Sequence, residues 1–142
     1  MNSSRPTTIR AETSLRSVSP NATDSPVPAS FRYDPADPYA VHLRFWSEHE
    51  PVSWSFAREL LLTGLNQQAG VGDVRVHPSP WITPGSETMT LSLSSPDGQA
   101  QFEVRRKVIV KFLRRSYALV PRDHETHYQD VDAAIARLLG SA

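Results

Sequence analysis

The sequence of 142 residues contains no cysteine. Disulfide scaffolds, thiolate metal sites and cysteine nucleophiles are therefore excluded together. An excess of charge is also absent, because fifteen Lys and Arg side chains balance fifteen Asp and Glu side chains. A net charge of zero removes the simplest argument for nucleic-acid binding, which is a globally basic chain. No apolar run approaches the ~20 residues that a membrane span needs, and the N-terminus has no hydrophobic signal core. We therefore expect a soluble, cytoplasmic chain of about one domain.

No motif combines residue type and spacing in the way that a catalytic or metal site requires. His124 and His127 stand three residues apart, whereas a zincin helix needs a spacing of four to bring both to one metal. Gly70 and Gly72 resemble a phosphate-binding turn, but the pattern after them predicts a strand rather than a helix whose N-terminus could hold an anion. No serine lies in a Gly-x-Ser-x-Gly turn. We predict a protein that is not an enzyme and that has no cofactor and no metal.

Residues 1–26 are rich in Ser, Thr and Pro and poor in large apolar side chains. This composition predicts a weakly ordered N-terminal segment, followed by one domain over residues 27–142. Part of this N-terminal segment, residues 7–18, can form a first strand. Alternation of side chains along such a strand would place the apolar residues Ile9 and Leu15 on the same face.

From residue 28 onward, apolar and polar side chains alternate with a period of two, which is typical of half-buried strands. Turn residues such as Pro96, Asp97 and Gly98 separate the alternating stretches. Alternation on one side, joined by tight turns, predicts an antiparallel sheet with a single covered face. The apolar sets are Ala29, Phe31 and Tyr33; Tyr39, Val41, Leu43 and Phe45; Val52, Trp54 and Phe56; Val74 and Val76; Met89, Leu91 and Leu93; and Ala100, Phe102 and Val104.

Three stretches with helical periodicity could cover that face, over residues 57–65, 107–117 and 131–139. The resulting order is β-β-β-β-α-β-β-β-α-α, with two successive blocks of strands followed by helix. We therefore predict an α+β fold, in which a curved antiparallel sheet is packed by helices.

Positive charge is concentrated in the C-terminal part of the chain. Six of the eleven residues in 105–115 are basic and none is acidic. On the helix predicted there, Lys107, Lys111 and Arg114 fall opposite the apolar stripe. Trp46 lies on the polar side of its predicted strand. We predict that these four residues form a protein-interaction surface; the alternative is that the stripe is a solvated helix face and that Trp46 packs at the rim of the sheet.

Five segments of the chain resemble the SsgA-like proteins of sporulating actinomycetes, in the same order and with the same spacing over roughly residues 27–140. The second segment matches the family pattern Trp-x-Phe-x-Arg-(Asp/Glu)-Leu-Leu and contains Arg58 and Glu59, which would begin the first helix. The chain departs from the family in having Arg122 and Asp123 where Pro-Gly is usual, which is typical of a divergent paralogue. The segments are VPASFRYDPADPYAV at 27–41, WSFARELL at 54–61, GDVRV at 72–76, LSSPDG at 93–98 and FLRRSYALVP at 112–121.

The resemblance implies a non-enzymatic regulator that positions septation or wall-remodelling machinery during sporulation. It also implies a homotrimer, a fold similar to the whirly-type single-stranded nucleic-acid-binding fold, and a place at division septa. The implied partners are the tubulin-like division protein FtsZ or a sibling SsgA-like protein. The alternative hypothesis is single-stranded nucleic-acid binding through the basic helix. Zero net charge and the lack of a run of stacking aromatics disfavour nucleic acid as a partner.

Overall fold

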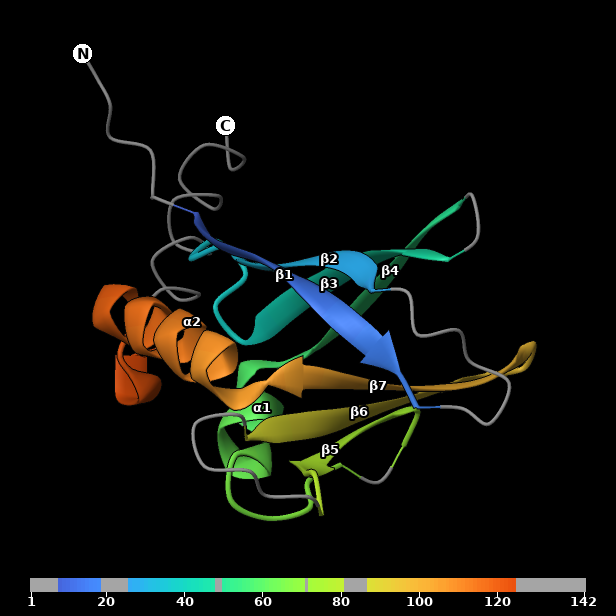
Figure 1. Ribbon diagram of the computed structural model, residues 1–142. Helices are drawn as coiled ribbons and strands as arrows, with labels where there is room; N and C mark the ends of the chain where they lie inside the picture. The colour runs from blue at the N-terminus through green and yellow to red at the C-terminus, as the bar shows by residue number, and fades with distance from the viewer. Residues whose placement is uncertain (1–7, 19–25, 48–49, 71, 81–86, 125–142) are drawn as a thin grey trace, which may run out of the picture.

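The computed structural model describes residues 8–18, 26–47, 50–70, 72–80 and 87–124. These residues form an α+β structure in which seven strands make one antiparallel sheet and two helices pack against it (Figure 1). The predicted order of strands and helices is confirmed as far as α2, whereas the helix predicted over residues 131–139 lies outside the described residues. The elements are β1 Ile9–Ser17, β2 Val27–Tyr33, β3 Ala40–Ser47, β4 Glu50–Ala57, α1 Arg58–Gly64, β5 Val74–Pro78, β6 Thr88–Ser95, β7 Gly98–Arg105, α2 Arg106–Leu119 and the 3-10 turn η1 Arg122–His124.

The sheet has the strand order β4-β3-β2-β1-β7-β6-β5, so that β1 stands between its two halves. β1 pairs with β2 from Ile9 to Leu15, but its register with β7 comprises two pairs at its end, Arg16 with Glu103 and Ser17 with Phe102. The two halves therefore meet at the C-terminal end of β1 and diverge toward its beginning (Figure 1). Ile9 and Leu15 are buried, as the alternation predicted.

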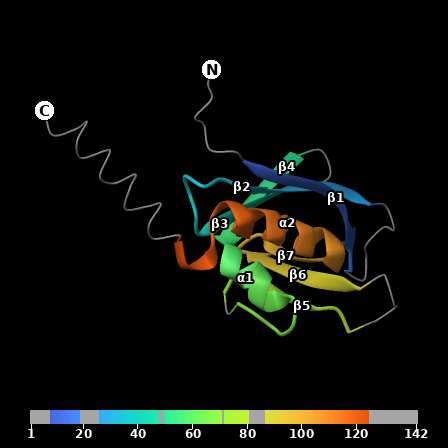
Figure 2. The ribbon, with the colours of Figure 1, turned by 90° about the vertical axis from the view of Figure 1, so that its left-hand side faces the viewer.

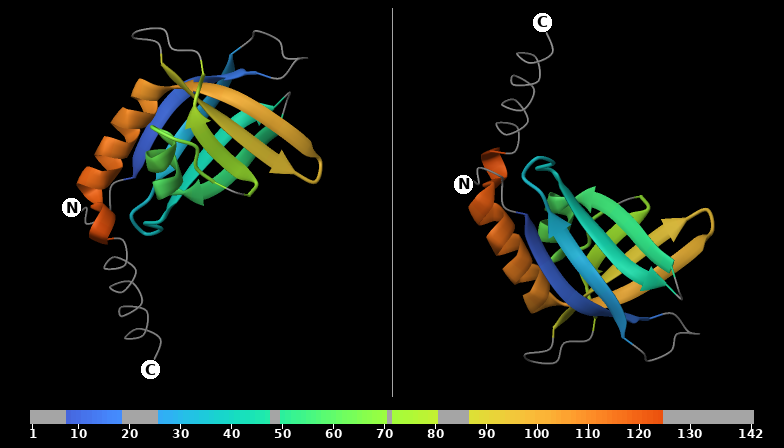
Figure 3. Two further views of the ribbon diagram at one scale, coloured as in Figure 1. Left: turned by 90° about the horizontal axis from the view of Figure 1, so that it is seen from below. Right: turned by 90° about the horizontal axis from the view of Figure 1, so that it is seen from above.

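Helix α2 lies in the opening between the two halves, with α1 beside it (Figure 2). Seen from below and from above, the strands form a strongly curled sheet and α2 lies alongside β1 (Figure 3). The buried face of α2 consists of Ile109, Phe112, Leu113 and Ser116. Phe112 packs on Phe31 of β2, with ring centroids 6.0 Å apart. The apolar stripe of α2 therefore covers the concave face of the sheet, as an amphipathic helix is expected to do.

The alternation predicted most of the core correctly. Phe31, Leu43 and Leu91 have no exposed surface. Phe45 and Phe102 bring the two halves of the sheet together, with ring centroids 4.9 Å apart. The concave side of the sheet is thus one continuous apolar cluster.

One aromatic residue is less buried than a core position implies, and a second is placed differently from the prediction. Trp54 has the predicted register and packs against the core, but it is half-buried because β4 is an edge strand of the sheet. Tyr39 was predicted to begin the alternating set of its strand, and this is wrong: it precedes β3 and is 40% exposed. The turn before β3 buries Pro38 instead, whose carbonyl oxygen accepts a hydrogen bond of 2.9 Å from Tyr33 Oη.

The connection that leads into β5 depends on Gly70. Its φ of 92° lies in the left-handed region, and a Cβ at this position would collide with the carbonyl oxygen of Val74. The next element after Gly70 and Gly72 in the described residues is strand β5, as the sequence pattern predicted.

Candidate protein-interaction surface

Three cations lie exposed on α2, on the side opposite its buried face. Lys107, Lys111 and Arg114 are separated by four and three residues, which places them on one side of a helix. Together with Arg106 and Glu87 they line a shallow groove of about 440 Å³. Among the residues that the structure describes, none of the three has an ion pair or a side-chain hydrogen bond. The structure therefore brings these three predicted residues together as an accessible basic surface.

The helix that carries this surface is anchored near both of its ends. In its first turn, the Arg106 Nη2 atom lies 3.4 Å from Asn66 Oδ1, just beyond α1. Near its last turn, Arg115 Nη1 donates to the backbone oxygen of Arg10 on β1, at 3.3 Å. Because these contacts hold α2 against both α1 and β1, the three cations project from a fixed support.

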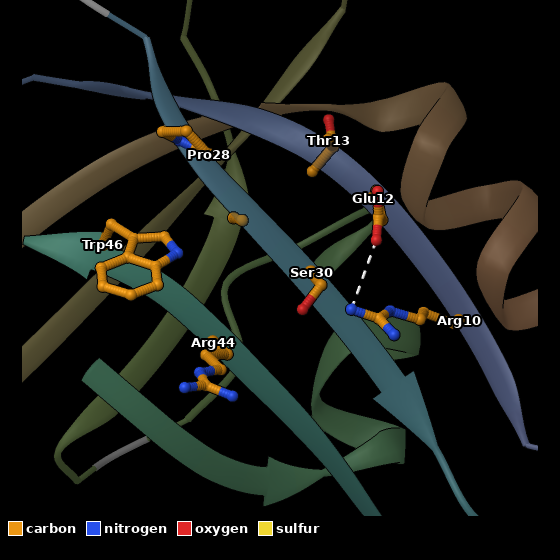
Figure 4. A pocket seen from close by; sticks show the side chains of 8 residues that line it. Arg10, Glu12, Thr13, Pro28, Ser30, Arg44 and Trp46 are labelled. Atoms are coloured by element: carbon orange, nitrogen blue, oxygen red, sulfur yellow. Dashed lines mark ion pairs between the residues drawn. The ribbon is translucent and has the colours of Figure 1, made fainter. Parts of the chain in front are cut away.

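Trp46, the fourth predicted residue, lies on the outer face of β3 and is 49% exposed. It lines a separate groove with Arg10, Pro28 and Arg44 (Figure 4). Trp46 therefore does not contact the groove of the three α2 cations directly.

A third groove connects these two surfaces across the edge of β1. It is lined by Lys111 and Arg115 from α2 and by Arg10 and Glu12 from β1. Lys111 also lines the α2 groove, and Arg10 also lines the groove of Trp46. The four residues predicted from the sequence thus lie along one band that runs from α2 over β1 to β3.

Arg58 is a feature that sequence reasoning missed. It was expected only to begin α1, yet its side chain is fully buried. Its guanidinium carbon Cζ lies 4.5 Å from the ring centroid of Tyr33 and 3.9 Å from that of Tyr117. Nη1 donates a hydrogen bond of 3.1 Å to the backbone oxygen of Ser116. One side chain of α1 therefore holds β2 and α2 together. Its spacing of three from the buried Leu61 was the available signal, because that spacing places both on one helix face.

Glu103 is a buried carboxylate at the junction of the two half-sheets, where β7 meets β1. Arg16 Nε donates to Oε1 at 3.1 Å, and the Thr88 hydroxyl donates to Oε2 at 3.1 Å. Burial acts to raise the pKa of Glu103, but the hydrogen bonds from Arg16 and Thr88 and the charge of Arg16 outweigh it and lower the pKa below 4.5. Glu103 is therefore an ionised structural group that links β1 to β7.

In the described part of the chain, no cluster of His, Asp and Glu side chains could hold a metal ion. His124 lies on η1, whereas His127, the other histidine of the pair that the sequence spacing excluded as a metal site, falls outside that part. The helices of the same residues include none with the length and apolar character to cross a membrane.

The fold and these surfaces can be compared with known proteins. A sequence model of one protein family, described as Streptomyces sporulation and cell division protein, SsgA, matches residues 27–125. This chain belongs to the SsgA family. The sporulation-specific cell division protein SsgB of Salinispora tropica is 61% identical over 95% of this chain and 95% of its own length. SsgB of Streptomyces coelicolor is 42% identical over 96% of this chain and 98% of its own.

Solved structures from the SsgA family have the same fold. The SsgA-like sporulation-specific cell division protein from Thermobifida fusca matches with a TM-score of 0.84 at 40% identity, over 96% of this chain and 98% of that one. A structure of SsgB from Streptomyces coelicolor matches with a TM-score of 0.80 at 43% identity, over 89% of this chain and 99% of that one. The resemblance drawn from the five sequence segments is thereby confirmed.

Proposed function

We propose that this protein regulates sporulation-specific cell division by binding another protein of the division machinery, and that it does so without catalysing a reaction. Its relatives in the SsgA family are named sporulation-specific cell division proteins. The observation that carries the proposal is the basic surface of α2, where Lys107, Lys111 and Arg114 are exposed and lack ion pairs among the described residues. Such exposed cations complement an acidic patch on a partner. They contribute more to the rate and specificity of association than to the stability of the fold.

A protein partner accounts for this surface better than a nucleic acid does. Successive stacking aromatics are the usual feature of single-strand binding sites, and the grooves along the band contain one exposed aromatic, Trp46, in the described residues. Acidic side chains also line the band, Glu87 beside α2 and Glu12 on β1. Their carboxylates interrupt the run of positive charge that a continuous phosphate backbone would follow, whereas an acidic patch on a protein contacts the cations alone.

The proposed partners are FtsZ or a sibling SsgA-like protein, and the proposed site of action is the division septum in the cytoplasm. We further propose that the protein acts as a homotrimer. Light scattering of the purified protein at micromolar concentration should give the mass of three chains. A monomer at that concentration would contradict the trimer.

The test uses a triple variant, Lys107→Gln, Lys111→Gln and Arg114→Gln. We expect wild-type protein to sediment with FtsZ polymers or to bind a sibling SsgA-like protein, and the variant to lose that binding. A fluorescent fusion of the variant should also fail to gather at septa in the sporulating host. The matched control is Arg75→Gln, which changes an exposed cation on β5 at the far edge of the sheet.

The thermal midpoint of the triple variant should stay close to that of wild type, because exposed charges contribute little to stability. Submicromolar binding of single-stranded DNA that disappears in the triple variant would refute the proposal. Unchanged binding to both proteins and normal septal localisation of the variant would refute it as well.

A further inference from the structure

The outer face of the sheet carries three arginines on three neighbouring strands. Arg10 of β1 stands directly opposite Arg32 of β2, and Arg44 of β3 stands opposite Ser30 of β2. All three are exposed. Arg10 forms an ion pair with Glu12 at 3.3 Å, whereas Arg32 and Arg44 have no ion pair among the residues that the structure describes. Like charges placed directly opposite in a sheet destabilise it, so folding stability does not account for this arrangement.

Two adjoining grooves follow these arginines. The groove of Trp46 has a volume of about 370 Å³, and the neighbouring groove, which Arg32 lines, has about 360 Å³. Arg10, Ser30 and Arg44 line both grooves, which makes them one continuous depression across β1, β2 and β3. Figure 4 shows Arg44 and Trp46 on the same strand, β3. Exposed Trp and Arg side chains are the types most enriched where binding energy is concentrated.

The spacing of these side chains fits an extended peptide. Arg32 and Arg44 are diagonal neighbours in the register of β2 and β3, a position for which the separation is about 7–8 Å. Trp46 follows Arg44 by two residues on β3, which corresponds to about 6.8 Å along a strand. An extended chain presents alternate side chains on one side at about the same interval, ~6.6–6.8 Å. Arg32, Arg44 and Trp46 therefore match positions i, i+2 and i+4 of such a chain.

We infer that this outer face is a second binding site, which takes an extended protein segment with two alternate acidic residues followed, two positions on, by an apolar one. Each guanidinium would bind one carboxylate with two parallel hydrogen bonds, a geometry that arginine favours. The apolar side chain would pack on the indole of Trp46. The inference rests on the proposed function, because it names the kind of segment that a protein partner would carry. A nucleic acid is disfavoured because Glu12 interrupts the run of cations that a continuous phosphate backbone would follow.

The probe is a fluorescein-labelled peptide of nine residues, in a serine and glycine background, with glutamate at two alternate positions and phenylalanine two positions further. Fluorescence anisotropy is measured against the full chain. We expect saturable binding that weakens as salt is raised, and no binding of the same peptide with lysines in place of the glutamates. Arg44→Gln should weaken binding about fivefold, the upper scale of one exposed ion pair. Trp46→Ser should weaken it also, because the apolar side chain of the peptide loses the indole on which it packs. Arg75→Gln, on β5, should leave the affinity unchanged.

Several results would overturn the inference. They are the absence of saturable peptide binding, a loss of peptide affinity in Arg75→Gln equal to that in Arg44→Gln, and tighter binding of an oligothymidylate than of the peptide. The triple variant of α2 separates this site from the proposed function. If it loses FtsZ or sibling binding but still binds the peptide, the outer face is a site of its own. If the triple variant no longer binds the peptide, then the peptide binds at α2 and the inference is wrong.

Discussion

Replacing Arg58 with alanine should destabilise the protein strongly, although this arginine lines none of the four grooves described above. The guanidinium carbon lies 4.5 Å and 3.9 Å from the ring centroids of Tyr33 and Tyr117. A desolvated cation–π contact contributes about 2 kcal/mol, and the charged hydrogen bond to the Ser116 oxygen about 1.5–3 kcal/mol. Since removing the guanidinium from water cancels part of this gain, we expect Arg58→Ala to lower the free energy of unfolding by about 4 kcal/mol.

Two further substitutions separate the role of the charge from that of the volume. Arg58→Met keeps most of the volume and removes the cation and its donors, so it should cost about 2 kcal/mol, the scale of one desolvated cation–π contact. Arg58→Lys keeps the charge but loses the planar group that lies between the two rings. The stability of this variant should therefore fall between the stabilities of Arg58→Met and Arg58→Ala. Arg75→Ala is the control, because this exposed cation of β5 should change stability by no more than about 0.5 kcal/mol.

The assay is urea unfolding followed by far-UV circular dichroism, with the midpoint and the slope of the transition compared between variants. If Arg58→Met were as stable as wild type, the guanidinium would contribute nothing beyond its volume and the reasoning would be refuted. A loss below about 1 kcal/mol in Arg58→Ala would also contradict it, because full burial makes such a small effect inconsistent with the structure.

Three further predictions concern packing and charge. Gly64→Ala places a Cβ 2.5 Å from Val76 Cγ1, so overpacking should lower stability by about 1–2 kcal/mol in urea melts despite the better helix propensity of alanine; an increase in stability would contradict this packing. Trp54→Ala should cost about 2 kcal/mol, less than the ~3–5 kcal/mol for a fully buried tryptophan, because the residue is half-buried. The pKa of Glu103 is lowered below 4.5 in the folded protein, so its contribution is present above that pH and is lost as pH falls through the folded value. The difference in unfolding free energy between wild type and Glu103→Gln should therefore be largest near neutral pH and shrink in acid; a difference independent of pH would show that the carboxylate charge is not involved.

The features that the sequence determined by itself are those that depend on local periodicity. Alternation with a period of two identified Met89, Leu91 and Leu93 as core residues, and all three are buried. The period of a helix placed Lys107 and Lys111 on the solvent side of α2, where the structure has them. Such patterns succeed because backbone geometry alone decides which side chains share a face.

The features that only the tertiary structure decided require residues that are distant in the chain. Arg58 is buried because rings from β2 and α2 enclose it, and no pattern within its own helix contains them. Trp54 remains half-buried because β4 is an edge of the sheet, and strand order is not a local property. The path from Lys111 over Arg10 to Trp46 exists because β1 diverges from β7 and α2 occupies the opening. Periodicity assigns each side chain to a face of its own element, whereas packing between elements decides which of those faces become neighbours.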